Sequence, residues 1–193
     1  MALRLSTPYG VIPGSRPEGT FGAVLQMLLK ARLDLRMDAG PEQYDEDVNA
    51  YLGGVLVSYI DPEYLSGIST VLSRCDVDLH LAIRRAMPDK SRIYRIYKVN
   101  ADDMLLSLGI FRRLWQEEQP EMERIKQYYA CAADCHKRIY GKPTAVAEIQ
   151  EKLSVCTERY LAVLSQARKE YLHFVQQVSP EDLAEFGRQI HPE

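Results

Sequence analysis

The chain has 193 residues, of which 46% are hydrophobic and 26% charged, a balance that argues against disorder and allows one domain with a substantial core. Its formal net charge of -3 gives no overall attraction to nucleic acid or to an anionic membrane, so neither is expected as a partner. Four cysteines are too few and too unevenly placed for a disulfide framework, and the first residues lack a secretory signal. We therefore expect a cytoplasmic protein with reduced thiols.

The first part of the chain predicts a lead-in followed by two helices. Residues 1–19 are rich in proline and glycine, which is typical of an extended segment without a helix of its own. Apolar residues at helical spacing predict a first helix over 20–37 and a second over 42–59. Gly53 and Gly54 weaken the middle of the second helix, which indicates that another backbone comes close there or that the helix bends.

A third helical region begins at Asp61-Pro62-Glu63. An aspartate cap, a proline at the first helical position and an acid in the first turn all favour a helix start. The apolar spacing that follows predicts one or two helices as far as Met87. Residues 77–83 also alternate as a strand would, but we prefer a helix because only 93–99 offers a partner strand.

The segment from residue 92 to 99 repeats a cation at every third position, with isoleucine and tyrosine between, and its structure is the hardest to predict. Asn100 is predicted to cap the helix that follows, with Asp102 and Asp103 in its first turn. This helix completes the N-terminal group of helices over 20–117.

Residues 120–178 predict a long antiparallel helical hairpin. Gly141 is expected to end the first arm in a left-handed conformation, and Pro143 or Thr144 can open the next helix. In the second arm, apolar residues recur in steps of three and four, which is typical of one continuous buried seam. A short helix over 180–191 follows. The whole chain thus predicts a single all-α domain, a helical bundle with a C-terminal hairpin.

The second arm of the hairpin is longer than the first, so part of its apolar seam needs another partner. A helix over 144–178 is roughly 50 Å long at about 1.5 Å per residue, more than the first arm can cover. The overhanging seam is either buried by the N-terminal helices or by a second copy. We therefore predict a homo-oligomer or a complex with another protein, with the interface at Tyr160, Val163, Ala167, Tyr171 and Phe174.

Charge is distributed unevenly along the chain. Acids dominate residues 34–63 and bases dominate residues 84–113. The simplest interpretation is two solvated faces that attract each other within the fold, and an alternative is contact between the acidic segment of one copy and the basic segment of another. A further interpretation is a phosphate-and-stacking surface for a nucleotide or nucleic acid, formed by Arg92, Tyr94, Arg95, Tyr97 and Lys98.

A cluster of cysteine and histidine residues lies in the hairpin. Folding the hairpin brings Cys156 near Cys131 and Cys135, which share a helix face, and His136 follows directly. Thiolates and an imidazole are suitable zinc ligands, although the spacing matches no known structural-zinc pattern. Cysteine is also a small residue that suits a tight helix contact, and we favour core packing over a metal site.

The sequence names no catalytic residue and no cofactor. It lacks a nucleophile elbow, a zinc-protease motif and a glycine-rich phosphate loop. With 12 tyrosines against 4 phenylalanines, we expect many hydrogen bonds from tyrosine to polar groups, or rings that face a binding surface. The leading hypothesis is a self-associating interaction or scaffold protein. The alternative is a bundle that binds a small ligand or metal, with or without catalysis, in a pocket lined by Tyr128, Tyr129, Cys131, Cys135 and Cys156.

Overall fold

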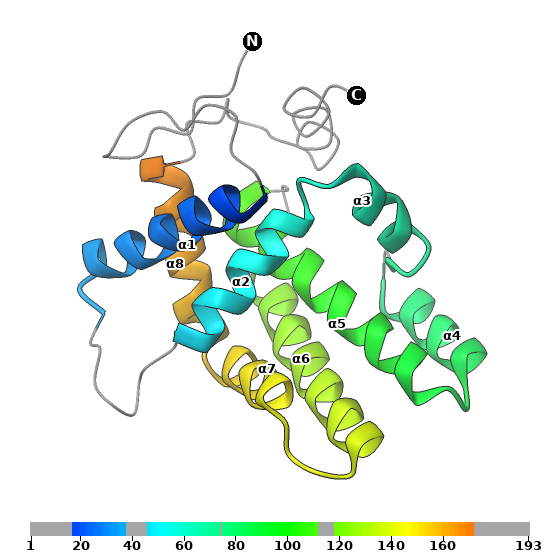
Figure 1. The fold of residues 1–193 in the computed structure, drawn as a ribbon. Helices are drawn as coiled ribbons and strands as arrows, with labels where there is room; N and C mark the ends of the chain where they lie inside the picture. The colour runs from blue at the N-terminus through cyan, green and yellow to red at the C-terminus, as the bar shows by residue number, and fades with distance from the viewer. Residues whose placement is uncertain (1–16, 38–45, 74, 112–117, 172–193) are drawn as a thin grey trace.

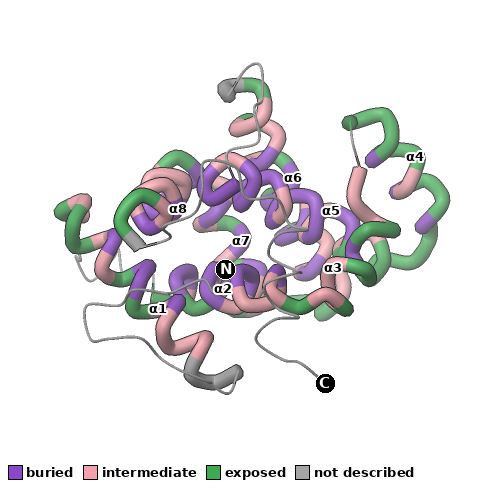
Figure 2. Tube along the Cα trace, turned by 90° about the horizontal axis from the view of Figure 1, so that it is seen from above, coloured by how far each residue is buried: buried purple, intermediate pink, exposed green. Residues whose placement is uncertain are grey.

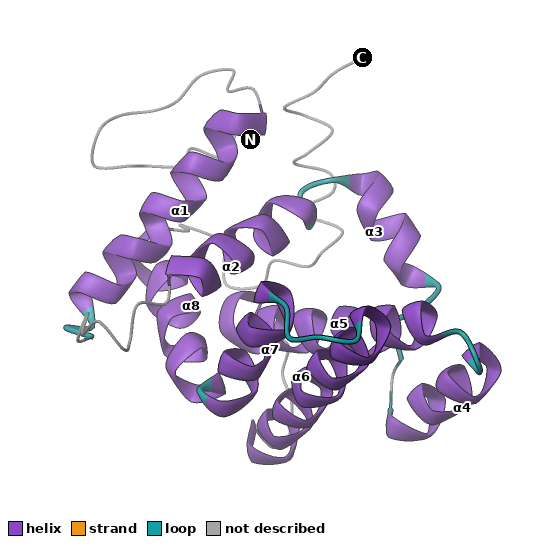
Figure 3. Cartoon of the chain, turned by 60° about the horizontal axis from the view of Figure 1, so that its bottom comes forward, coloured by secondary structure: helices purple, strands orange, loops and turns teal. Residues whose placement is uncertain are grey.

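The computed structural model describes residues 17–37, 46–73, 75–111 and 118–171 (Figure 1). These ranges contain helices and connecting loops but no strand, which confirms the all-α prediction (Figure 3). In chain order the elements are α1 (Pro17–Asp34), α2 (Glu46–Ser58), α3 (Pro62–Ser69), α4 (Asp76–Ala86), α5 (Lys90–Leu106), the π-helical turn η2 (Ser107–Phe111), α6 (Glu118–Tyr140), α7 (Ala145–Val155) and α8 (Thr157–Tyr171).

The helices α5 and α6 lie side by side at the centre of the fold, and the other helices pack around them (Figure 1). The helix α7 packs against α6, α1 packs against α2 and α8, and α4 packs against α5 at the edge of the molecule. Buried positions concentrate along α5 and α6 and on the inner sides of α2 and α8 (Figure 2). Fully buried side chains of this core include Leu28, Leu52, Leu105, Ile125 and Tyr129.

The restart after α2 follows the local chemistry of the sequence. Asp61 is the N-cap of α3, and its carboxylate accepts a hydrogen bond from the backbone N–H of Glu63 at 2.9 Å. Residues 77–83, which alternate as a strand would, belong to α4 instead. Residues 93–99, the only candidate for a partner strand in the sequence, are helical as well.

The helix α5 starts earlier than the sequence indicates. Asp89 is its N-cap and accepts from the backbone N–H of Arg92 at 3.0 Å, so the uncertain segment 92–99 is helical. The prediction that Asn100 caps a helix is therefore wrong, because Asn100 lies in the middle of α5. The predicted turn features at the end of α6 are present: Gly141 has a φ of 67°, and Thr144 caps α7.

The predicted second arm of the hairpin is divided in the structure. Cys156, with φ -114° and ψ 32°, ends α7, and α8 begins at Thr157. The hydroxyl of Thr157 donates to the carbonyl of Leu153 at 2.6 Å, a contact that competes with regular helix hydrogen bonding and often accompanies a bend. Beyond the break, α8 packs mainly against α1 and η2 instead of continuing along α6. Residues 172–178 and the short helix predicted over 180–191 lie outside the described residues.

Two packing features depend on glycine. A Cβ atom at Gly53 would lie 3.2 Å from the ring of Phe21, so the close neighbour of this glycine is a side chain of α1 and not a backbone. At Gly109 in η2, a Cβ atom would lie 2.6 Å from the Cβ atom of Leu164. The second distance is far shorter than real carbon contacts, so α8 can sit this close to η2 only because residue 109 has no side chain.

Candidate functional site

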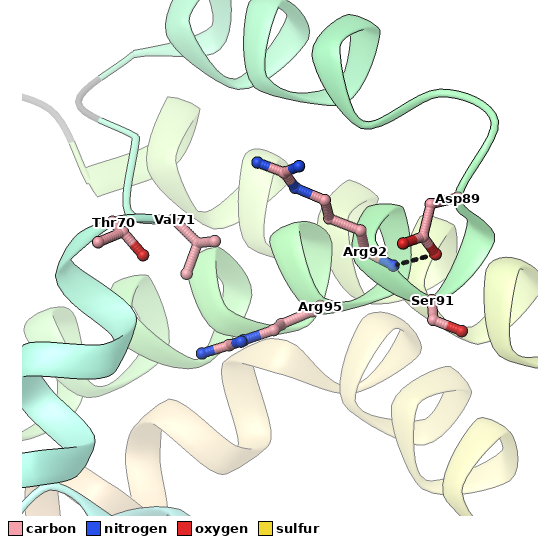
Figure 4. A pocket seen from close by; sticks show the side chains of 6 residues that line it. All are labelled: Thr70, Val71, Asp89, Ser91, Arg92 and Arg95. Atoms are coloured by element: carbon pink, nitrogen blue, oxygen red, sulfur yellow. Dashed lines mark hydrogen bonds between the residues drawn. The ribbon is translucent and has the colours of Figure 1, made fainter.

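A pocket of about 490 Å³ opens beside the first two turns of α5 (Figure 4). One side is the chain that leaves α3, at Thr70 and Val71. The other side is the start of α5, with Asp89, Ser91, Arg92 and Arg95. Both arginine side chains extend from α5 into the space beside Thr70 and Val71 (Figure 4). The pocket thus combines two guanidinium groups, polar side chains and one apolar residue.

Asn100 holds the two sides of this pocket together. Its amide nitrogen donates to the carbonyl of Val71 at 2.9 Å and to the carbonyl of Ile96 at 2.8 Å. Its amide oxygen accepts from the backbone N–H of Ser73 at 2.7 Å. Asn100 is only 3% exposed, so its amide group is shielded from water, and a bond that it loses is not replaced by one to solvent. One side chain therefore fixes the chain after α3 against the middle of α5.

The end of α3 is also tied to α5 by Arg95. Its Nη2 atom donates to the carbonyl of Gly67 at 3.2 Å, one of the carbonyls that the last turn of α3 leaves without a helical partner. An arginine has five N–H donors, so the guanidinium keeps donors for a ligand. Arg95 is exposed, and the contact orients its side chain across the pocket mouth.

The electrostatics of the pocket favour a negatively charged ligand. Its lining holds two arginines against one aspartate, and that aspartate already accepts from the backbone N–H of Arg92. Within the described residues, the guanidinium of Arg92 makes no hydrogen bond or ion pair and is exposed. Lys90 adds another exposed cation at the start of α5, where the helix dipole also favours negative charge.

The five residues of the predicted phosphate-and-stacking surface do not share one face. Arg92 and Arg95 line the pocket, whereas Tyr94 accepts a hydrogen bond from the Gln150 amide at 3.1 Å and Lys98 forms an ion pair with Asp102 at 2.7 Å. Tyr97 packs against the ring of Tyr128, with the ring centroids 6.1 Å apart, and lies near Cys131. The structure thus keeps the two arginines as a candidate site and removes the two tyrosines and the lysine from it.

The cysteine and histidine cluster does not form a metal site. Across the described parts of the chain, no three histidine, cysteine, aspartate or glutamate side chains are placed to hold a metal ion. Cys131 and Cys135 lie near Tyr97, and burial raises the pKa of both thiols. Cys156 lies at the junction between α7 and α8.

His136, the fourth member of that cluster, has a structural environment. Its ring lies 4.8 Å from the ring of Tyr94 and 4.7 Å from that of Tyr140, measured between centroids. The Nδ1 atom forms a hydrogen bond of 2.8 Å with the hydroxyl of Thr144, the N-cap of α7. Burial lowers the pKa of His136 below its ordinary value of 6.5, which favours the neutral ring. His136 thus supports the turn between α6 and α7.

Several tyrosines donate hydrogen bonds to carboxylates, as the number of tyrosines in the sequence suggests. Asp102 has a side chain with no exposed surface and accepts from the hydroxyls of Tyr51 and Tyr129, each at 2.8 Å. Tyr59 donates to Asp103 at 3.2 Å, and Tyr128 donates to Asp76. Burial and the neighbouring carboxylate raise the pKa of both Tyr51 and Tyr129, so they are neutral donors at ordinary pH.

Two sets of predicted residues are thereby placed in the core. Tyr128 is 5% exposed and Tyr129 0%, so these members of the predicted tyrosine and cysteine pocket are packed among other side chains. At the predicted interface, Tyr160, Val163 and Ala167 are each 1% exposed or less within a single chain. The side chain of Tyr171 and the whole of Phe174 lie outside the described residues.

Comparisons of the chain with protein-family models, with curated proteins and with solved structures give no significant match. None of the helices in the described ranges combines the length and the apolar character that a bilayer crossing requires.

The sequence alone did not identify four of the six pocket residues. The Pro88-Asp89 pair before a helical pattern is a signal for an N-cap, and it could have placed the start of α5 and Ser91 correctly. No local signal marks Thr70 and Val71, because long-range bonds from Asn100 and Arg95 on α5 place this part of the chain beside the pocket.

Proposed function

We propose that the protein binds a phosphate-bearing small molecule in the pocket between Arg92 and Arg95. The observation that carries the proposal is the pair of exposed arginines, which come from successive turns of α5 and line the same pocket. The planar guanidinium group matches the geometry of phosphate oxygens and binds them through two parallel hydrogen bonds. The volume of about 490 Å³ lies within the range of about 300–1,000 Å³ typical of small-molecule sites.

The other lining residues have supporting roles in this proposal. The exposed hydroxyl of Ser91 provides a further hydrogen-bond donor, and Val71 offers apolar contact for the part of the ligand beyond the phosphate. The carboxylate of Asp89 would repel a negatively charged ligand, but it already accepts a hydrogen bond from a backbone N–H at the start of α5. The proposal concerns binding alone, because the lining contains no pair of groups arranged as nucleophile and base.

A titration with phosphate compounds tests this function. Isothermal calorimetry at low salt with inorganic phosphate, pyrophosphate and a nucleoside triphosphate is expected to show saturable binding that weakens with added salt. A hydrogen bond to a charged group contributes about 1.5–3 kcal/mol, so Arg92→Ala and Arg95→Ala should each weaken binding about 10-fold or more. Arg138→Ala, which removes an exposed arginine on α6, is the matched control and should leave the affinity unchanged.

Two outcomes count against the proposal. Wild-type protein that binds none of the three compounds at millimolar concentration contradicts it directly. Equal affinities for Arg92→Ala, Arg95→Ala and the Arg138→Ala control contradict the location of the site, even when binding itself is seen.

Self-association is a second candidate function, but it requires a surface other than the interface predicted from the sequence. The burial of Tyr160, Val163 and Ala167 in one chain removes the physical argument for an interface at these residues. We still propose self-association, because α4 exposes large apolar side chains elsewhere on the molecule. We also keep the cytoplasm as the proposed compartment, which the free thiols of the four cysteines support.

A further inference from the structure

The helix α4 buries one side and exposes apolar residues on the other. Leu79, Ile83 and Ala86 are buried against the body of the protein. Val77 is 67% exposed and Leu81 43% exposed. With 3.6 residues per helical turn, these two residues are stacked one turn apart on the side opposite the buried residues. The helix lies at the edge of the fold, away from α1 and α8, so its outer side faces away from the body of the molecule (Figures 1 and 3).

Two charged residues flank this apolar pair on the same side. Asp78 lies in the first turn of α4 and Arg85 in the last turn. They are seven residues apart, which is close to two helical turns, so both border the same edge of the exposed stripe. Within the described part of the chain, neither Asp78 nor Arg85 makes an ion pair. Asp76, in contrast, is held by Arg124 and Tyr128 on α6.

From this arrangement we infer that α4 is the interface with a second copy of the chain, packed antiparallel across a two-fold axis. In that orientation, Asp78 lies opposite the partner's Arg85, and the symmetric pair forms at the other end of the contact. Leu81, which lies next to the axis, packs against Leu81 of the partner subunit, and Val77 lies nearer the end of the contact. An antiparallel two-fold contact brings the same edge of both helices together, so the two opposite charges on that edge of α4 are complementary in it.

The choice of α4 over other exposed apolar residues rests on this self-complementarity. Leu29 and Leu33 form a similar exposed pair on α1, but the charged residues beside them already interact within the chain. Tyr140 and Val155 are also exposed, but they are single residues in separate elements and need no partner. Met87, which is 65% exposed, follows directly after the helix and adds apolar surface at its end. A contact between two helices of this length falls below about 1,200 Å², the size of weak and transient interfaces, so we expect a dissociation constant in the micromolar range.

Apolar substitutions on the outer side of α4 give the first test. Sedimentation velocity over a concentration series is expected to show a monomer–dimer equilibrium for the wild-type protein. Leu81→Ser should raise the dissociation constant at least about 10-fold, because a central apolar contact is worth more than about 1.4 kcal/mol, and Val77→Ser, nearer the end of the contact, should raise it less. The control is Val155→Ser, the same change at a 76% exposed valine on α7, and it should leave the equilibrium unchanged.

A charge exchange gives the second test, and it addresses the antiparallel geometry. Asp78→Arg and Arg85→Asp should each weaken self-association, because each places two like charges opposite one another twice per dimer. A mixture of the two variants should dimerise as well as the wild-type protein, since both pairs are complementary in the mixed dimer. The double variant, with both exchanges in one chain, should also recover.

The outcomes separate this inference from its alternatives. A wild-type protein that stays monomeric at hundreds of micromolar overturns it, and so does a Leu81→Ser variant that dimerises like the Val155→Ser control. Failure of the mixture to recover, with normal helix content by circular dichroism, overturns the antiparallel geometry. If a charge exchange unfolds α4, the comparison of Leu81→Ser with the Val155→Ser control still tests whether α4 forms the interface. Phosphate binding should be unchanged in all α4 variants, so this inference and the proposed function can fail separately.

Discussion

The hydroxyl of Tyr129 on α6 donates a hydrogen bond of 2.8 Å to the carboxylate of Asp102 on α5, and both groups are fully buried. The same carboxylate accepts from Tyr51 on α2 and from Lys98 one turn earlier on α5. Three helices therefore meet at a single side chain. Burial lowers the pKa of the Lys98 ammonium group, but Asp102 and the nearby Tyr64 and Tyr94 together raise it by more, so this group stays charged.

Loss of the Asp102 carboxylate should destabilise the protein strongly. Asp102→Ala leaves two buried hydroxyls and a largely buried ammonium group without their acceptor, and we expect a loss of about 3–5 kcal/mol in the free energy of unfolding. Tyr51→Phe removes only one donor and should cost about 1 kcal/mol. Urea unfolding followed by circular dichroism measures both. Similar losses for the two variants would show that Asp102 does not organise the network.

The hydrogen bonds of Asn100 make a second prediction, on both stability and binding. Asn100→Ala leaves the carbonyl of Val71 and the N–H of Ser73 unpaired, which should cost about 2–3 kcal/mol and loosen one side of the pocket. Ser73→Ala is the matched control, because Ser73 takes part through its backbone and the bond survives the change. Thermal unfolding and phosphate calorimetry are the measurements. We expect the control to match the wild-type protein in both, and a binding loss in the control would contradict this account of the pocket.

A pair of glycine substitutions tests the contact between η2 and α8. Gly109→Ala places a methyl group 2.6 Å from the Cβ atom of Leu164 and should destabilise the protein by about 1–3 kcal/mol through overpacking. Gly54→Ala places its methyl group where no other atom lies within 4 Å, inside α2, and should stabilise it by about 0.5–1 kcal/mol. The opposite signs of the two changes in chemical denaturation are the decisive result. A stabilising Gly109→Ala would mean that α8 sits further from η2.

The pKa of His136 predicts a pH dependence of stability. Burial lowers this pKa below 6.5, so the unfolded chain takes up a proton at a higher pH than the folded protein does. Stability should therefore be constant above about pH 7 and fall as the pH drops through about 6.5, until the folded protein is protonated as well. The difference in unfolding free energy between the wild-type protein and His136→Gln, measured from pH 5 to 8, isolates this contribution. A difference that does not change with pH contradicts the prediction.

Features that depend only on residues near one another in the chain could be predicted from the sequence. The cap at Asp61, the turn at Gly141 and the all-α class all follow from short stretches of sequence. The break at Cys156 and the role of Asn100 did not, because each is accompanied by interactions that periodicity does not report. The seam of the second arm continues across the break, but its residues beyond it are covered by α1 and η2.

The candidate site was predicted in part for the same reason. Because the sequence did not show whether residues 92–99 form a helix, its five basic and aromatic residues could be grouped into one phosphate-and-stacking surface. Once α5 is known to run through them, a rotation of about 100° per residue puts Arg92 and Arg95 on one side and Tyr94 and Tyr97 on the other, with Lys98 between the two sides and paired with Asp102. The tyrosines then serve the core, and only the arginines remain available to a ligand.

The packing of α1 against α8 joins two segments that are synthesised far apart in time. As the chain leaves the ribosome, α1 emerges early and has to wait for α8, the last described helix, before that contact can form. Contacts of such long sequence separation slow folding, whereas α6 and α7 can associate as soon as both are made. A product terminated before residue 157 would expose the α1 surface that α8 normally covers, and we expect cellular proteases to remove it.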